Sequence, residues 1–268
     1  MEKIIEIENL NFKYQNKIIF DNLNLTVNEG TFLTIGGQSG CGKSTLLKMI
    51  TGFIETDCIT VCHKKVEKTN LKEIRKEVSI VFENPKDSFT QDLVIDNLVF
   101  PLENLNYTKE KMKERVQEVS EYFKIEHLLD RSISTLSGGE QEKVALSIAL
   151  ITHPKILLLD ESLIMLDELE KEKALKLLKK LNKDKKITII LVTHDMEEST
   201  YGKEIAILNN GKIISIDKIK NLYKNEKIFK NNGLNLPFMA NLSLKLKYYE
   251  LVDDVILDMD KMVNHLWK

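Results

Sequence analysis

The feature that most constrains this chain is a glycine-rich octapeptide of the pattern G-x-x-x-x-G-K-S at residues 37–44. It follows the short apolar segment 31–35 and precedes a segment with helical periodicity, 44–51. A strand, a glycine-rich turn and a helix in this order bind phosphate, because backbone N–H groups and the positive end of the helix point at the anion. A glycine-rich turn without function would explain neither the lysine nor the serine. The candidate nucleotide-binding residues are Gly37, Gln38, Ser39, Gly40, Cys41, Gly42, Lys43, Ser44 and Thr45.

A second apolar segment, 156–159, ends in two carboxylates, Asp160 and Glu161. In a phosphate-loop site Lys43 neutralises the β- and γ-phosphates, and the Ser44 hydroxyl coordinates Mg²⁺. Asp160 would then complete the Mg²⁺ shell, and Glu161 would polarise the attacking water as a general base. A strand that ends in a solvated acidic turn is the alternative. The pattern predicts ATP and Mg²⁺ as ligands.

Charge and hydropathy exclude several other classes of protein. The chain has 268 residues with 39 basic and 41 acidic side chains, and its net charge of −2 gives no electrostatic reason to expect a nucleic-acid partner. The longest apolar runs, 187–192 and 156–159, are far shorter than the roughly 20 residues of a membrane-spanning helix. The N-terminus lacks the apolar core of a secretory signal, so a cytoplasmic location is expected.

The three cysteines are too few for a disulfide framework, and we expect them to be reduced. Cys58, Cys62 and His63 suggest a metal site, but no second pair stands at ligand spacing. A short strand that contains Cys62 is the favoured interpretation.

Hydrophobic periodicity predicts an α/β fold. Segments 3–10 and 17–35 indicate an antiparallel β-layer, whereas the buried-strand patterns 78–82, 155–159 and 187–192 favour a parallel sheet. The stretch of about 86–153 is mostly helical in pattern and is predicted to be a helical insertion.

The remaining segments complete a two-part organisation. A charged helix is predicted at 168–181, and a hairpin at 205–208 and 212–216. After it come a lysine-rich helix, a break at 233–237 and an apolar-periodic helix to the end. We therefore predict a nucleotide-binding domain at 1–217 and a C-terminal helical extension at 218–268.

The segment 136–141, Leu-Ser-Gly-Gly-Glu-Gln, resembles the signature of ATP-binding cassette (ABC) ATPases. Ser137, Gly138, Gly139 and Glu140 precede a predicted helix, whose N-terminus would be a second anion site. One phosphate loop leaves no phosphate for it to bind. The resemblance implies that this segment binds the γ-phosphate held by a second subunit, so that two cassettes enclose two ATP molecules.

Other landmarks of the family occur in the same order. The resemblance implies that Tyr14 stacks on adenine, that Asp167 lies in a loop crossing the dimer interface, and that His194 contacts the γ-phosphate and joins Glu161 in catalysis. Each of these residues alone would more often be a core aromatic, a helix cap or a turn residue. Their order around the two strong motifs favours the functional interpretation.

Within ABC ATPases the chain is similar to the ATP-binding subunits of energy-coupling factor (ECF) importers for vitamins and transition metals. The similarity rests on segments 81–85, 97–104, 165–167 and 233–238. The last of these resembles the C-terminal segment that holds two such ATPases together, which implies that the extension dimerises.

The ECF resemblance implies an ATPase bound peripherally to the cytoplasmic face of the membrane. Its partners would be a second ABC ATPase, as a homo- or heterodimer, an integral membrane coupling protein and a substrate-binding membrane subunit, with no nucleic acid. An ATPase of another ABC transporter branch and a soluble ABC ATPase are the alternatives. A small-molecule kinase is opposed by the signature.

Three positions depart from the family pattern. Glu83 stands where the family has a glutamine that touches Mg²⁺, Ser162 replaces a proline, and Lys143 replaces an arginine. We expect these changes to affect hydrolysis more than ATP binding. Glu83 thereby joins Ser44 and Asp160 as a candidate metal ligand, the alternative being an exposed glutamate in a flexible loop.

Overall fold

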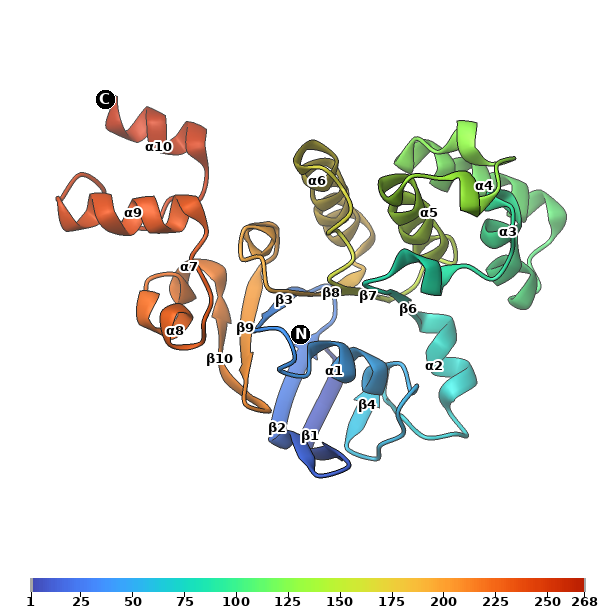
Figure 1. Cartoon of the computed structure of the whole chain (residues 1–268), viewed down its shortest axis with the longest axis horizontal. Coiled ribbons are helices and arrows are strands. Elements are labelled where there is room, and N and C mark those ends of the chain that lie inside the picture. The colour runs from blue at the N-terminus through green and yellow to red at the C-terminus, as the bar shows by residue number, and fades with distance from the viewer. Residues whose placement is uncertain (1, 268) are drawn as a thin grey trace.

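The structure, a computed structural model, describes residues 2–267 and is built around a six-stranded sheet of strand order β10-β9-β3-β8-β7-β6 (Figure 1). All neighbours in this sheet are parallel except the hairpin of β9 and β10. The strands are β3 (Phe32–Gly36), β6 (Val78–Val81), β7 (Ile156–Asp160), β8 (Thr188–Thr193), β9 (Glu204–Asn209) and β10 (Lys212–Lys218). The predicted α/β fold with a parallel sheet is confirmed.

Both faces of this sheet are covered, which explains its continuous apolar strands. Leu157 and Leu159 of β7 belong to one hydrophobic core, together with residues of α6 (Glu168–Lys185). Ile156 and Leu158 point the other way, into a core with α1 (Lys43–Ile50). In Figure 1 these two helices lie on opposite sides of the sheet.

A second, antiparallel sheet of order β2-β1-β4-β5 covers α1 from below in Figure 1. Its strands are β1 (Lys3–Tyr14), β2 (Lys17–Asn28), β4 (Ile59–Val61) and β5 (Lys64–Lys65), and α2 (Leu71–Glu77) leads back to β6. The prediction that the antiparallel layer extends to residue 35 is wrong. β2 ends at Asn28, and β3 crosses into the parallel sheet because all five of its residues are buried.

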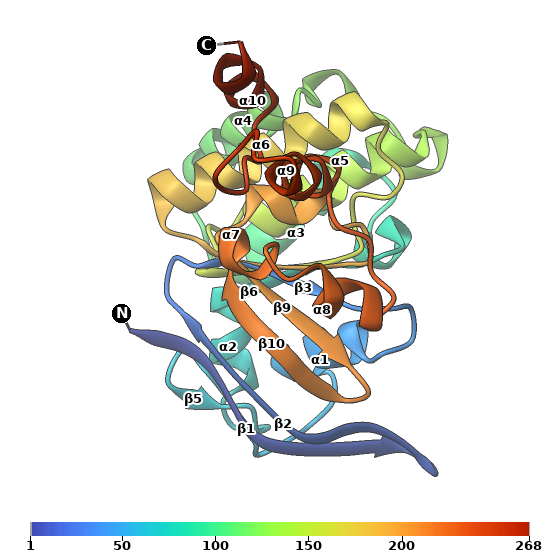
Figure 2. The same ribbon diagram turned by 90° about the vertical axis from the view of Figure 1, so that its left-hand side faces the viewer.

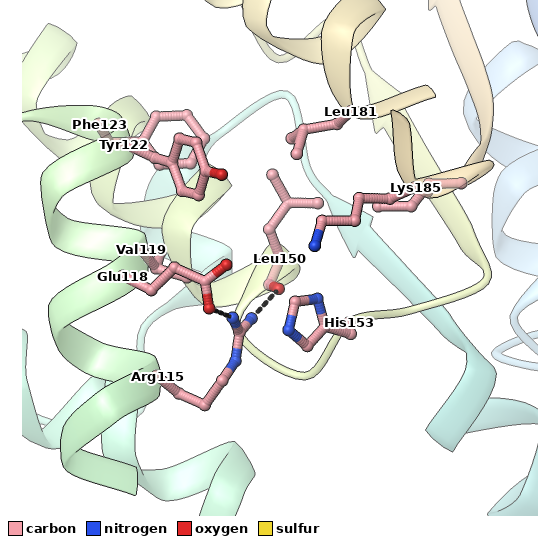
Figure 3. Close-up of a pocket in the computed structure, with 10 residues that line it drawn as sticks. Arg115, Glu118, Val119, Tyr122, Phe123, Leu150, His153, Leu181 and Lys185 are labelled. Carbon is pink, nitrogen blue, oxygen red and sulfur yellow. Dashed lines mark hydrogen bonds and ion pairs between the residues drawn. The ribbon is translucent and has the colours of Figure 1, made fainter. Parts of the chain in front are cut away.

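Helices fill the segment between β6 and β7. They are α3 (Val94–Asn104), α4 (Lys109–Phe123) and α5 (Gly138–Leu150), accompanied by the short 3₁₀ turns Pro85–Ser88, Glu126–Leu128 and Ile133–Thr135. The Arg115 guanidinium donates hydrogen bonds to the carbonyls of Leu150 and Ile151 at the end of α5 and pairs with Glu118 (Figure 3). The cavity beside it, of about 20 Å³, has room for about one water molecule. The hydrogen bonds of Arg115 join α4 to the end of α5, and none of these residues belongs to the sequence motifs.

The C-terminal residues fold as short helices, α7 (Ile219–Leu222), α8 (Glu226–Asn231), α9 (Phe238–Tyr248) and α10 (Met259–Leu266). The predictions of one lysine-rich helix and of one helix to the end are therefore wrong. The chain turns back after α9, where Glu250 adopts a positive φ of 59°. Because these helices are short and the chain reverses between them, they cover one face of β9. Ile205 and Ile207 of β9 lie in a third core with Leu234, Ala240 and Val255.

α9 and α10 lie at the end of the molecule opposite to the β1–β2 hairpin (Figure 2). No helix within residues 2–267 combines the length and the apolarity needed to cross a bilayer.

Candidate nucleotide-binding site

Four neighbouring parallel strands end at the same edge of the sheet, and the sequence motifs follow them. The register pairs Gly36 of β3 with Thr193 of β8, and Asp160 of β7 with Val192 of β8. Val81 of β6 pairs with Leu159. The glycine-rich loop, the acidic pair, His194 and Glu83 therefore all leave the sheet at its carboxyl edge, where open α/β sheets bind ligands.

The glycine-rich loop encloses the side chain of its own lysine. Lys43 is 4% exposed, and its Nζ donates to the carbonyl oxygens of Gly37 at 2.8 Å and Gln38 at 3.2 Å. Gly42 has a φ of 108°, a conformation that other residues rarely adopt. A Cβ on Gly37 would lie 2.5 Å from the carbonyl oxygen of Leu208. Glycine is thus required both by the curl of the loop and by its approach to β9.

Ser44 and Asp160 meet at the start of α1. The Ser44 hydroxyl donates a 2.8 Å hydrogen bond to Asp160 Oδ1. Burial raises the pKa of the Asp160 carboxyl, and the negative charges of Glu83 and Glu161 raise it further, against the Ser44 hydrogen bond. Oxygen donors of this kind suit Mg²⁺, and a dication there would offset the mutual repulsion of the carboxylates. The residues present therefore fit the metal.

The Glu161 carboxylate lies between the side chains of Lys43 and His194. Its Oε1 is 3.1 Å from Lys43 Nζ, and its Oε2 is 2.7 Å from His194 Nδ1. Burial opposes ionisation of Glu161, but Lys43 and His194 outweigh it and hold the pKa of the carboxyl below its ordinary value. The residue has a φ of 48°, a left-handed conformation that is unusual for glutamate and concentrates at functional sites. The geometry supplies an ionised carboxylate beside the phosphate loop.

The signature residues form a separate hollow of about 590 Å³ with the loop before α6. Ser137 and Glu140 cap α5 reciprocally: the Ser137 Oγ accepts from the Glu140 N–H at 3.3 Å, and the Ser137 N–H donates to Glu140 Oε2 at 2.8 Å. A Cβ on Gly138 would lie 2.9 Å from Met165 Sδ. The residues that line the hollow are Ser137, Gly138, Gly139, Glu140, Lys143, Met165, Leu166, Asp167 and Glu170. Among the described residues, this lining includes nothing from the chain's own phosphate loop.

Asp167 and Tyr14 occupy simpler positions. Asp167 caps α6 by accepting the Glu170 N–H at 2.8 Å, which fits the helix-cap alternative while leaving the residue at the hollow. Tyr14 is 47% exposed at the end of β1 and meets Phe12 edge to face at 4.9 Å. The facing strand β2 contacts the loop, because a Cβ on Gly42 would lie 3.0 Å from Phe20. Phe20 pairs with Phe12, two residues before Tyr14, so this part of the hairpin lies beside the phosphate loop.

Comparisons with known proteins identify the family to which this chain belongs. A family model described as ABC transporter matches residues 20–163. The energy-coupling factor transporter ATP-binding protein EcfA1 of Oenococcus oeni is 34% identical, with 99% of this chain and 98% of the relative aligned. The chain belongs to the ABC transporter family, within its energy-coupling factor ATP-binding proteins. EcfA1 of Ligilactobacillus salivarius is 36% identical over 91% of this chain and 88% of its own. The resemblance that the sequence indicated is confirmed.

Solved structures of the family share the fold of this cassette. The structure of cbiO1 from Clostridium perfringens, described as part of the ABC transporter complex cbiONQ, has a TM-score of 0.77 and 27% identity. It covers 90% of this chain and 99% of its own. The dimeric cassette MJ0796, solved in a post-hydrolysis state with ADP and Pi, has a TM-score of 0.73 and 29% identity over 81% of this chain and 99% of its own.

One residue of the cassette that sequence reasoning missed is Glu142. It is 1% exposed, and neither of its carboxylate oxygens has a hydrogen-bond partner of ordinary geometry within residues 2–267. Burial raises its pKa to about 8, and the nearby backbone N–H groups of Met165 and Leu166 only partly oppose this. A signal was available, because Glu142 falls on the apolar face of α5, one turn before Leu146.

Proposed function

We propose that this chain is the ATP-binding and ATP-hydrolysing subunit of an ECF-type importer for vitamins or transition metals. The observation that carries the proposal is the hollow formed by the signature residues together with the Asp167 loop. This hollow lies apart from the chain's own phosphate loop. It would bind a phosphate group only if a second cassette supplied the nucleotide. A kinase or a single-domain nucleotide binder has no use for it.

The chemistry follows from the groups at the carboxyl edge of the sheet. The loop amides and Lys43 would bind the phosphates of ATP, and the phosphates would replace the carbonyl oxygens that now accept from Lys43. Ser44 and Asp160 would hold Mg²⁺, with Glu83 beside them. When bound, Mg²⁺ supplies positive charge that offsets the negative charge of the phosphates. Glu161 would accept a proton from the attacking water, and His194 would orient Glu161 and contact the γ-phosphate.

Closure of two cassettes would bring each hollow onto the partner's ATP, and hydrolysis would release the pair. The extension at 218–268 is proposed to hold the two ATPases together. A groove of about 340 Å³ is lined by residues that include Phe82, Asp87, Pro101 and Ala145. We propose that this groove receives the integral membrane coupling protein. It adjoins the loop that carries Glu83, so a movement of that loop when nucleotide binds would change the shape of the groove. The substrate-binding membrane subunit would join through that protein.

Two alternatives remain for comparison with this proposal. Another ABC transporter branch is opposed by relatives that are at least 34% identical, align over nine-tenths of this chain or more and carry the ECF name. The same relatives oppose a soluble, non-transport ABC ATPase.

The proposal is tested by measuring MgATP hydrolysis of the purified chain and by isolating the tagged protein from its host in mild detergent. We expect hydrolysis that Lys43→Ala abolishes, and co-isolation of a second ABC ATPase and integral membrane proteins. Isolation of the chain with ribosomal or DNA-repair proteins instead would contradict the transport assignment.

A further inference from the structure

The segment 232–238, here called the clamp segment, links the phosphate loop to the C-terminal helices. Gly233 lies against the Gln38 side chain so closely that a Cβ on Gly233 would be 1.7 Å from Gln38 Nε2. The adjacent Leu234 is 4% exposed, and its Cδ1 would lie 3.4 Å from a Cβ on Gly36, the last residue of β3. The clamp segment therefore touches the strand end and the loop that precede Lys43.

The same segment also contacts the chain that follows His194. Met196 is 3% exposed and shares a hydrophobic core with Leu234. The Phe238 N–H, at the start of α9, donates a 2.5 Å hydrogen bond to Glu197 Oε1. Because His194 contacts Glu161, the clamp segment reaches both halves of the candidate site.

A third contact fixes the segment to the sheet. Asn232 is 8% exposed and accepts a 2.7 Å hydrogen bond from Asn209 Nδ2 at the end of β9, while its own Nδ2 donates to the Ile228 carbonyl at 2.6 Å. Leu208, the neighbour of Asn209, carries the carbonyl that abuts Gly37. The end of β9 therefore contacts both the clamp segment, through Asn209, and the phosphate loop, through Leu208.

From these contacts we infer that the clamp segment is a positioning element of the nucleotide site, acting through Gly233 on Gln38 and through Phe238 on Glu197. The inference rests on the proposed function, since it assumes that ATP binds at residues 37–45. Free-energy coupling between two sites is reciprocal. Nucleotide binding should therefore hold the C-terminal helices in place, and displacement of those helices by a partner should weaken nucleotide binding.

A double-mutant cycle on the full-length chain tests the contact. Gly233→Ala should weaken MgATP binding roughly 5-fold or more, because the new methyl group displaces Gln38. In a Gln38→Ala background the same change should have much less effect, since the side chain that it displaces is gone. The matched control is Gly30→Ala: Gly30 has a φ of 68°, close to the 65° of Gly233, but a Cβ there would meet nothing nearer than 3.7 Å.

Two further measurements complete the test. Amide exchange at Phe238 should slow when MgATP binds, and Glu197→Ala should remove more of that protection than Glu197→Gln, which keeps an acceptor oxygen. The inference is overturned if Gly233→Ala affects ATP binding no more than Gly30→Ala does, or equally with and without Gln38. The same cycle measured by urea unfolding without nucleotide separates the two proposals. If Gly233 and Gln38 are coupled in unfolding free energy but the chain binds no ATP, the proposed function is contradicted. If the chain binds ATP but the two substitutions have additive effects, only the role of the clamp segment is contradicted.

Discussion

Glu161 shows how much chemistry one residue position determines. Its backbone is left-handed, and its carboxylate contacts both Lys43 and His194. A carboxylate held in this way is ionised at neutral pH and is positioned by two independent contacts. A substitution at Glu161 removes neither Lys43 nor the loop amides, so the groups that bind phosphate stay in place.

Glu161→Gln should keep ATP binding and stabilise the closed dimer, while lowering the hydrolysis rate roughly 10²–10⁴-fold through loss of the general base. Size-exclusion chromatography with MgATP, alongside a phosphate-release assay, measures both effects. Glu110→Gln, on the exposed first turn of α4, is the control and should leave both unchanged. Hydrolysis at the wild-type rate would show that Glu161 is not the base.

Glu142 makes the stability of the chain depend on pH. Its pKa is about 8 in the folded protein against 4.5 as the ordinary value, so between these pH values the folded state binds more protons than the unfolded state. Stability from this group is therefore greatest below about pH 4.5 and falls as the pH rises towards 8. Each pKa unit corresponds to about 1.4 kcal/mol of unfolding free energy.

Glu142→Gln removes this titration, and the variant should gain on the wild type as the pH is raised from 5.5 to 8.5. Urea unfolding at three pH values measures the gain as a difference. Asp160, whose pKa burial also raises, is present in both proteins and cancels. A difference that stays constant with pH would mean that Glu142 is ionised throughout.

At the scale of elements, the loop after β6 connects the candidate metal site with the groove proposed for the membrane protein. Glu83 follows β6 and is close enough to Asp160 for its charge to raise the pKa of that carboxyl, while Phe82 lines the groove proposed for the membrane protein. Glu83 is also exposed, as its alternative interpretation required. A carboxylate in this loop can ligate Mg²⁺, but it repels phosphate when the metal is absent.

We therefore expect ATP affinity to rise steeply with free Mg²⁺, and Glu83→Gln to flatten that dependence and raise turnover. Titration of ATP binding against free Mg²⁺ for both proteins tests this expectation. Asp87→Asn neutralises another carboxylate of the same loop, in the turn Pro85–Ser88, and should reproduce the wild-type curve. Superimposable curves with equal turnover for Glu83→Gln would show that Glu83 never enters the metal site.

The elements also show which parts of the fold can be predicted from sequence. β7 and β8 were predicted to within about one residue, because strands buried on both faces have continuous apolar sequences. The motif residues of the site are equally local, since each follows its strand directly. The contacts of Gly233 and Phe238 escape such reasoning because they join segments far apart in the chain. Glu142 is different, since the helical period of α5 alone places it on an apolar face. The C-terminal helices were predicted poorly because their ends depend on packing against β9.

For the whole molecule, the extension has an inner and an outer surface with different roles. Leu236 and Leu244 pack partly on the chain's own third core. Large apolar side chains on the outer surface remain exposed, among them Tyr248 at 83%, Tyr249 at 70% and Phe238 at 61%. Exposed aromatic side chains of this size are typical of protein interfaces. Deletion after Asn232 would also uncover Ile205 and Ile207, so it would confound dimerisation with folding.

Substitution on the outer surface avoids that ambiguity. The double variant Tyr248→Ser with Tyr249→Ser should raise the dimer dissociation constant roughly 10-fold or more, because buried aromatic side chains contribute most to interface affinity. The thermal transition of the monomer should change little, since Ala240 and Val255 still cover β9. Sedimentation velocity with and without MgATP measures the association, and Lys245→Ser, exposed on the same helix, is the control. Unchanged association of the tyrosine variant would place the subunit contact elsewhere, whereas a collapsed thermal transition would assign the two tyrosines to the fold of the single chain.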